Sequence, residues 1–329
     1  MSTFNHLRIP LDEIQKATKN FCEKNIIGKG DFGYVYKGQL LRSGDLINIS
    51  ARRLDRSQGQ GDMEFWTEIS ILSSLKHPNI VSLIGFCDEK GEKIIVNRHE
   101  AKGSLVMYLR DPALNWIHRL KISIAIANAL SYLHYEEGRN YSIIHRNINS
   151  STILLDDNFE AKLSGFEFSI KDSVDRMEHY ISSEVIGTQG YMDPETTKSG
   201  DVTEKSDIYS FGVILCEIMC GRKAFLPYES EDNKFLAPLA RSHNQNETHQ
   251  DIIHPDLWNQ MDPEVSDGFA QLACDCIKED RVERPDMIEI LFQLNGALED
   301  QLNSVIPVGF TMNFDLYSLV ERKKGKRII

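Results

Sequence analysis

The chain has 329 residues, of which 41% are hydrophobic and 26% charged, and its formal net charge is -12. This composition excludes a disordered chain, because a protein of this length and apolar content can bury one large core or two smaller ones. The acidic balance argues against nucleic acid as the main partner, since phosphate binding needs a basic face. One basic cluster lies at residues 322–327, where a solvated tail is favoured over a patch for anionic lipids.

Three membrane and secretion signals are not found in the sequence, while a targeting patch at 322–327 is the less favoured alternative to a solvated tail. No run approaches the roughly 18 apolar residues of a membrane span, and the N-terminus has no signal peptide and no myristoylation glycine. We therefore expect a cytoplasmic protein that meets membranes only through a membrane-bound partner. Nothing like an ectodomain precedes Phe4, so we do not expect a complete receptor. The six cysteines form no C-x-x-C pair, which favours reduced, buried thiols.

Residues 26–97 consist of short β-rich segments around one helix. That helix is expected over residues 64–75, where Phe65, Ile69, Leu72 and Leu75 recur at helical spacing. The polar stretch 98–102 suits a hinge. From residue 103 onward the apolar spacing is helical, as in Ile117, Leu120, Ile124 and Ala127 and again in Ile208, Phe211, Leu215 and Ile218.

These patterns predict an α+β fold in which a small β-rich lobe with one main helix precedes a larger helical lobe. We place an N-terminal flank at 1–25, a domain at 26–298 and a C-terminal tail at 299–329. Within the domain the small lobe covers 26–97, the hinge 98–102 and the large lobe 103–298.

Gly28, Gly30 and Gly33 form a glycine loop in the run G-K-G-D-F-G. Alone this is a weak signal, because the same spacing opens dinucleotide-binding folds. A dinucleotide loop leads into a helix, whereas residues 34–37 here (Tyr-Val-Tyr-Lys) continue as a strand. The strand-turn-strand interpretation is therefore favoured.

Further motifs follow in order along the chain. They are I-S-A-R at 49–52, a helix that carries Glu68, H-R-N-I-N-S-S-T at 145–152, G-F-E at 165–167, G-T-Q-G-Y-M-D-P-E at 187–195, D-I-Y-S-F-G at 207–212 and E-R-P at 283–285. Together they resemble the signature set of protein kinases. The runs H-P-N-I-V-S-L-I-G-F-C and Y-M-D-P-E resemble the cytoplasmic domains of plant receptor-like kinases, the malectin-type receptors among them. The resemblance covers residues 20–298 and implies the two-lobed protein kinase fold.

Four positions that the resemblance assigns to phosphoryl transfer are replaced. Asn147 stands where the family has the aspartate that accepts the substrate proton, and Asn149 where it has a lysine for the γ-phosphate. Thr152 and Gly165 stand where the family has the two magnesium ligands. The resemblance therefore implies no intact catalytic residue, no metal site and no ordinary magnesium binding. Asp156, beside Asp157, is interpreted as part of a strand-turn pair, in preference to a rescuing metal site.

The lysine that steadies the α and β phosphates in the family is Arg52 here. Arginine keeps the positive charge and can pair with Glu68, but its planar fork does not place a compact cation on the phosphates. Glu167 replaces the glycine that ends the family's D-F-G motif. Both sites of change lie at the phosphate end of the implied nucleotide site.

Nucleotide binding is left open by the same resemblance. Val35 and Leu154 would enclose an adenine, and hinge contacts through the backbone tolerate changed side chains. Two alternatives remain. Either the pocket binds ATP without a metal ion, or it is empty and contributes only to the shape of the protein. The implied nucleotide-binding positions are Gly28, Gly30, Gly33, Val35, Ser50, Arg52, Arg98, His99, Glu100 and Leu154.

Other family features are retained. The stacked apolar column is present as Leu83, Leu72, His145 and Phe166. The resemblance further implies that Asp207 braces the catalytic loop and that Glu195 pairs with Arg284 to tie down the activation segment.

Arg146 is the family's phosphate-reading arginine. We hypothesise that it reads a phosphate added by another kinase, and the alternative is that it pairs with ordinary carboxylates. The candidate acceptors in the activation segment are Ser173, Ser182, Ser183 and Thr188.

Two functions follow from the resemblance. The first is a pseudokinase that acts as a scaffold or allosteric regulator of an active protein kinase or receptor-like kinase. The second is a weak or unconventional ATP-dependent protein Ser/Thr kinase, supported by the glycine loop, Glu68 and Phe166.

Overall fold

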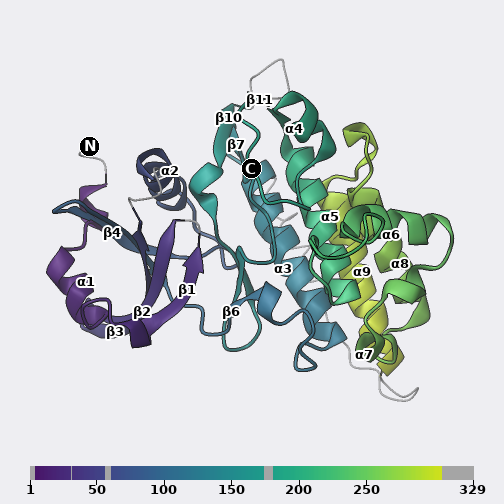
Figure 1. Cartoon of the computed structure of the whole chain (residues 1–329), viewed down its shortest axis with the longest axis horizontal. Helices are drawn as coiled ribbons and strands as arrows, with labels where there is room; N and C mark the ends of the chain where they lie inside the picture. Colours follow the sequence, from purple (N-terminus) through teal and green to yellow (C-terminus); the bar gives the residue numbers. More distant parts are fainter. Residues whose placement is uncertain (1–3, 31, 56–60, 174–180, 306–329) are drawn as a thin grey trace, which may run out of the picture.

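The computed structural model describes residues 4–30, 32–55, 61–173 and 181–305. The basic cluster at 322–327 lies outside these residues. The chain folds into two lobes, with a sheet-dominated lobe on the left of Figure 1 and a helical lobe on the right. The α+β, two-lobed fold expected from the sequence is confirmed.

The small lobe is built on a five-stranded antiparallel sheet with the order β1-β2-β3-β5-β4. Side chains alternate between its two faces, because successive residues of a strand point to opposite sides. Ile49, Ala51 and Val96 belong to one buried cluster, whereas Leu54 and Ile95 belong to the other. The strands are β1 (Ile26–Gly30), β2 (Gly33–Arg42), β3 (Asp45–Leu54), β4 (Leu83–Glu89) and β5 (Glu92–Arg98).

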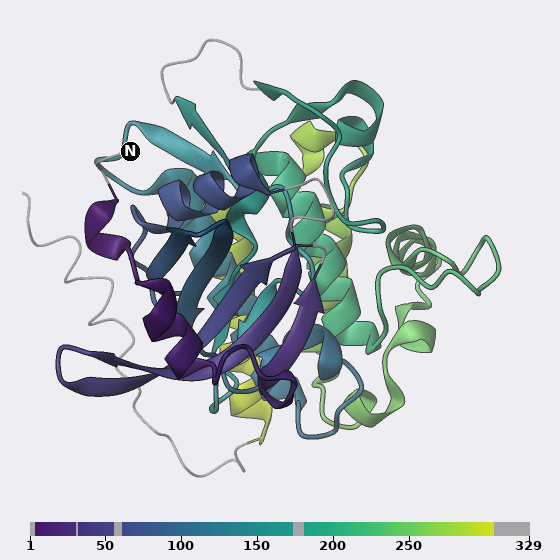
Figure 2. The ribbon, with the colours of Figure 1, turned by 60° about the vertical axis from the view of Figure 1, so that its left-hand side comes forward.

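One helix covers each face of this sheet. Helix α1 (Leu11–Ala17) packs on the face of Ile49 with its buried residues Leu11 and Ile14, and α2 (Asp62–Leu72) packs on the opposite face with Phe65. Figure 2 shows both helices against the sheet. The segment expected to be a flank, residues 1–25, therefore supplies part of the core of the small lobe.

Helix α2 is shorter than the expected helix over 64–75. It begins at Asp62 after a capping box, in which the Glu64 carboxylate accepts the N–H of Gly61 at 3.0 Å. It ends at Leu72, because the hydroxyls of Ser73 and Ser74 donate to helix carbonyls and compete with the backbone pattern. Leu75 lies beyond the helix and packs on the core of the large lobe.

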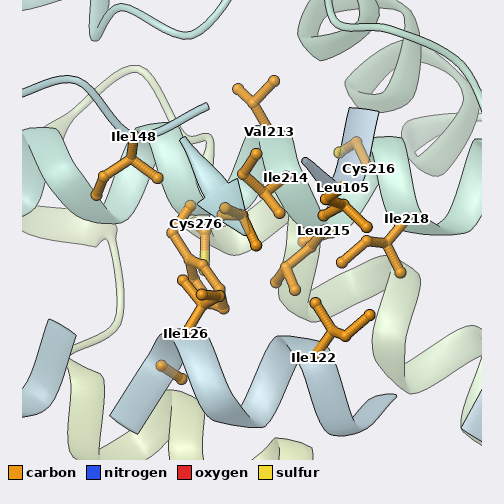
Figure 3. Close-up of a cluster of buried hydrophobic side chains, with 14 of the residues drawn as sticks. Leu105, Ile122, Ile126, Ile148, Val213, Ile214, Leu215, Cys216, Ile218 and Cys276 are labelled. Atoms are coloured by element: carbon orange, nitrogen blue, oxygen red, sulfur yellow. The ribbon is translucent and has the colours of Figure 1, made fainter. Parts of the chain in front are cut away.

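The large lobe is organised around α5 (Glu204–Cys220), in which every residue from Ser206 to Cys220 is buried. Figure 3 shows its apolar side chains meeting those of α3 (Trp116–Tyr135). Both helices expected from apolar spacing are thus confirmed. The remaining α-helices are α4 (Pro194–Ser199), α6 (Leu236–Gln245), α7 (Pro255–Trp258), α8 (Pro263–Cys276) and α9 (Met287–Val305), and the short strands are β6 (Gly103–Ser104), β7 (Tyr141–Ile144), β8 (Ile153–Leu155), β9 (Ala161–Leu163), β10 (Ile170–Ser173), β11 (Ile181–Ser182) and β12 (Asp201–Val202).

Helix α9 continues past the expected domain end at residue 298. Its Gln301 is buried, accepts the N–H of Asp262 at 3.0 Å and donates to the carbonyl of Gln260 at 3.1 Å. The tail expected from 299 therefore starts inside a helix. Across the described ranges, no helix combines the length and the apolar character that crossing a membrane requires.

All six cysteines are free thiols, as expected. Four of them, Cys87, Cys216, Cys220 and Cys276, are buried. Burial raises the pKa of Cys216 well above its usual value, which keeps this thiol protonated and unreactive.

Candidate functional site

The phosphate end of the implied nucleotide site is occupied by a buried group of three charges. Arg52 on β3 pairs with Glu68 on α2, and its Nη1 lies 3.6 Å from Oε2 of Glu167. The two carboxylate side chains are only 3% and 5% exposed. The pair between Arg52 and Glu68 was expected from the sequence, whereas the second carboxylate on Arg52 was not.

These charges alter one another's proton affinity. Burial alone would lower the pKa of Arg52, but Glu68 and Glu167 outweigh it and raise that pKa. Burial raises the pKa of Glu68; Arg52 opposes this shift and the like charge of Glu167 adds to it. The group therefore carries one carboxylate more than its guanidinium can neutralise.

Glu167 also reaches the catalytic loop. It lies in a 3-10 turn, η5 (Phe166–Phe168), that packs against α2. Its Oε1 accepts a hydrogen bond from Nδ2 of Asn147 at 3.0 Å. The side chain thus connects a strand of the small lobe with the loop that carries the replaced proton acceptor.

The replaced catalytic-loop residues are bonded to one another. Oδ1 of Asn147 accepts from Nδ2 of Asn149 at 3.1 Å and from the hydroxyl of Thr188 at 2.9 Å. The hydroxyl of Thr152 donates to the carbonyls of Asn147 and Asn149 at 3.0 and 2.9 Å. These three side chains form a network without a charge of its own, which Asn147 joins to the carboxylate of Glu167.

Gly165 adopts the left-handed conformation, with φ at +86°. A Cβ atom at this position would lie 2.6 Å from Cγ2 of Thr152, so no side chain fits without a shift of that methyl group. Within the described ranges, no group of three or more His, Cys, Asp or Glu side chains is arranged to hold a metal ion. Asp156 accepts the backbone N–H groups of Asn158 and Glu160, which supports its interpretation as a turn residue.

The internal column and its brace are in place. The rings of His145 and Phe166 lie 4.6 Å apart between centroids, and Leu72 is buried. Asp207 accepts the N–H of His145 at 2.7 Å and that of Arg146 at 2.9 Å, and its Oδ2 lies 3.0 Å from Nε2 of His134. Burial lowers the pKa of His145.

The expected pair of Glu195 and Arg284 is not formed. Arg284 instead binds Asp193 at 2.9 Å, and Glu195 lies 3.1 Å from Arg281. The reason is burial, since the side chain of Asp193 is 1% exposed and that of Glu195 is 45% exposed. Although burial alone would raise the pKa of Asp193, Arg284 and Arg281 lower it, so this carboxylate stays ionised as the tie of the activation segment.

Arg146 contacts backbone carbonyls. It donates to the carbonyl of Phe168 at 3.2 Å and to that of Glu184 at 2.8 Å, and its Nε is buried without a hydrogen-bond partner among the described residues. Its side chain therefore lies beside the stretch that carries Ser183, one of the candidate phosphate acceptors.

The three glycines of the glycine loop differ in the space that a side chain would find. A Cβ atom at Gly28 or Gly30 would meet no atom within 4 Å, whereas at Gly33 it would lie 2.1 Å from the carbonyl oxygen of Arg53. Gly33 is thus required by the packing of β2 on β3. Phe32 at the tip is 9% exposed, and its ring lies 5.7 Å from that of Phe168.

The residues implied to bind adenine lie on strands β2 and β3 and at the start of the hinge. Ser50 lies opposite Lys37 in the sheet, and Val35 lies opposite Arg52. Arg98 and His99 use their N–H groups to bind the carbonyls of Ser82 and Asn48 at 2.9 and 3.1 Å.

Two more of these positions are partly or fully covered. Leu154 is half-buried against the core of the large lobe. Glu100 is 5% exposed, with Oε1 at 3.9 Å from Nζ of Lys162, and burial raises its pKa.

Comparison with known proteins assigns the family. A model of the protein tyrosine and serine/threonine kinase family matches residues 21–294. The receptor-like protein kinase ANXUR2 of Arabidopsis thaliana is 40% identical over 297 residues, which cover 89% of this chain and 34% of that protein. The receptor-like protein kinase FERONIA of the same plant is 38% identical over 293 residues, or 88% and 32% of the two chains.

The chain therefore belongs to the protein tyrosine and serine/threonine kinase family. Its similarity to plant receptor-like kinases, expected from the motifs, is confirmed. The chain spans about a third of the length of these relatives.

Proposed function

We propose that this protein is a pseudokinase that acts as a scaffold or allosteric regulator of an active protein kinase or receptor-like kinase. The observation that carries the proposal is the neutral network of Asn147, Asn149 and Thr152 beside Gly165. Phosphoryl transfer in the family depends on a carboxylate that accepts the proton, a lysine for the γ-phosphate, and an amide and a carboxylate that hold magnesium. Asn147, Asn149, Thr152 and Gly165 stand at these four positions. The packed column of His145 and Phe166 and the bonds of Asp207 support a role as a binding partner. They stabilise the kinase fold, and this does not require catalytic residues.

The test is a phosphotransfer assay on the full chain with radiolabelled ATP, first with magnesium and then with manganese. We expect no label on the chain or on a generic protein substrate. Activity that disappears in an Arg52→Ala variant would refute the proposal, since that activity would arise in this site. Copurified kinase activity is recognised because it would survive the same substitution.

The second candidate is a weak or unconventional Ser/Thr kinase. The glycine loop, Glu68 and Phe166 favour it, because they stand at positions that the resemblance assigns to active kinases. The same assay distinguishes the two functions.

Nucleotide binding is proposed to be independent of metal if ATP is the ligand. Val35 and Leu154 flank the implied adenine position, while the residues described above provide no carboxylate pair for magnesium. A thermal-shift titration with ATP, with and without divalent cation, tests this point. We expect any shift to be the same in both series, and a shift that needs magnesium would contradict the proposal.

The partner is proposed to be an active kinase in the cytoplasm, free or at the membrane as part of a receptor. Such a kinase would phosphorylate Ser173, Ser182, Ser183 or Thr188, and Arg146 would bind the new phosphate. Among the described residues its side-chain hydrogen bonds go to two carbonyl groups, and a phosphate would compete with the nearby charges of Asp207 and Glu184 for this cation. Phosphopeptide mapping after incubation with an active receptor-like kinase tests the switch, which is wrong if all four hydroxyls stay unmodified.

A further inference from the structure

The buried carboxylate of Glu167 is the second of two carboxylates that face one guanidinium. Arg52 already has a carboxylate partner in Glu68, and Glu167 adds a second at 3.6 Å. Its Oε2 is buried with no hydrogen-bond partner among the described residues. Burying a charged carboxylate is costly unless it is paired and hydrogen-bonded, and here Arg52 and Asn147 are its partners.

Glu167 is held in this position from both sides. Arg52 attracts one oxygen and Nδ2 of Asn147 donates to the other at 3.0 Å. The backbone gives little freedom either, because η5 packs against α2. These contacts favour the observed position of the carboxylate beside Arg52.

The glycine loop closes over the same group. The ring of Phe32 lies 5.5 Å from the guanidinium carbon of Arg52 and also contacts Phe168, which follows Glu167 in η5. The cationic face of Arg52 is thus enclosed by an aromatic ring and two carboxylates. Its side chain keeps 21% exposure, which leaves a route to it from solvent.

We propose that Glu167 is a built-in anion that takes the place of a ligand phosphate on Arg52, so that the wild-type protein gains no affinity from the phosphates of a nucleotide. Glu167 is not expected to affect binding of the adenine and ribose of the nucleotide. The inference concerns binding alone and stands apart from the assay of phosphotransfer. It assigns to Glu167 a role in ligand specificity that its position in the motif does not predict.

The test is calorimetric titration of the full chain, without divalent metal, using three probes: ATP, adenosine and inorganic triphosphate. Wild-type protein is expected to bind ATP no more tightly than adenosine. The Glu167→Gln variant keeps the size of the side chain and removes its charge. It is expected to bind ATP and triphosphate at least about tenfold more tightly than wild type, because a like charge within a few ångströms of the ligand is removed. Its affinity for adenosine should stay unchanged.

Two control variants separate charge at Arg52 from other effects. Glu184→Gln removes the same charge from an exposed side chain on the activation segment, so it should leave all three affinities at the wild-type values. Phe32→Ala opens the glycine loop but leaves both carboxylates on Arg52. It should not reproduce the gain of Glu167→Gln.

Three results would overturn the proposal. The first is wild-type binding of ATP at least tenfold tighter than adenosine, which needs no variant. The second is equal affinity of wild type and Glu167→Gln for triphosphate, including no binding by either. The third is a gain in Phe32→Ala as large as that in Glu167→Gln. If Glu167→Gln does not fold by circular dichroism, Glu167→Gly, which places the family's glycine there, is used with the same criteria.

Discussion

Two polar networks lie next to His145, and they differ in charge. In the first, which we call the Asp207 network, the carboxylate of Asp207 binds two backbone N–H groups and the ring of His134. In the second, which we call the Asn147 network, the uncharged side chains of Asn147, Asn149 and Thr152 are bonded to one another and to nearby carbonyls. The first network holds the backbone of the loop, and the second consists of side chains that would face a substrate. The charged Asp207 network supports the fold of the loop, whereas the uncharged Asn147 network lies where the family resemblance places the substrate.

The largest effect on stability is expected from Asp207→Asn, which breaks the Asp207 network. The amide offers one acceptor where two were used and places an NH₂ group against backbone donors. We expect the free energy of unfolding to fall by about 3–5 kcal/mol, as for other buried charged groups that lose a partner. Urea denaturation measures the change. Asn147→Ala also removes a hydrogen bond to the Glu167 carboxylate and should cost about 1.5–3 kcal/mol. An equal loss in the two variants would remove the distinction between the networks.

A second comparison separates the two carboxylates of the activation segment. Asp193→Asn leaves the buried guanidinium of Arg284 without a carboxylate and should lower the free energy of unfolding by about 3 kcal/mol. Glu195→Gln removes a half-exposed partner of Arg281 and should cost less than about 1 kcal/mol. Thermal denaturation of both variants checks the order, and the reverse order would restore the pairing expected from the sequence.

The pH dependence of stability tests a third buried carboxylate, Glu217 on α5. Burial raises its pKa to about 7, although Tyr191 donates to it at 2.7 Å. Because its pKa in the folded state exceeds that in the unfolded state, the folded state binds more protons and loses stability as pH rises from 5 to 8. The Glu217→Gln variant lacks this loss and should gain on the order of 2 kcal/mol relative to wild type over that range. Denaturant midpoints at several pH values measure the difference, and the exposed Glu231→Gln should follow wild type.

The smallest effect concerns Gly165. Gly165→Asp introduces a Cβ atom against Cγ2 of Thr152 and should lower the free energy of unfolding by about 1–2 kcal/mol. Thr152→Ser removes that methyl group and keeps the hydroxyl bonds, so the same change should cost less in a Thr152→Ser background. A double-mutant cycle by denaturation gives the coupling, and strict additivity would show that the contact does not matter.

Much of the molecule could be predicted from its sequence, and the exceptions share a cause. The lobes, α3, α5 and the partner of Arg52 on α2 follow from spacing and motif order. The role of Glu167 does not, because a motif gives the position of a residue but not the direction of its side chain. Asp193 and Glu195 flank one proline, and only the fold reveals which of the two is buried.

The ends of elements were also beyond the sequence patterns. Apolar spacing continued to Leu75, but local hydroxyl bonds end α2 at Leu72. Residues 1–25 were expected to be a flank, yet Ile9 and Ile14 fill the face of the sheet that α2 leaves open. Such outcomes depend on tertiary contacts that no local pattern contains.

The contact of the Thr152 methyl group with Gly165 has a consequence for engineering this chain. A carboxylate placed at 165 alone meets a steric obstacle, and an amide placed at 152 alone has no carboxylate beside it. A metal site at these positions therefore requires both substitutions together.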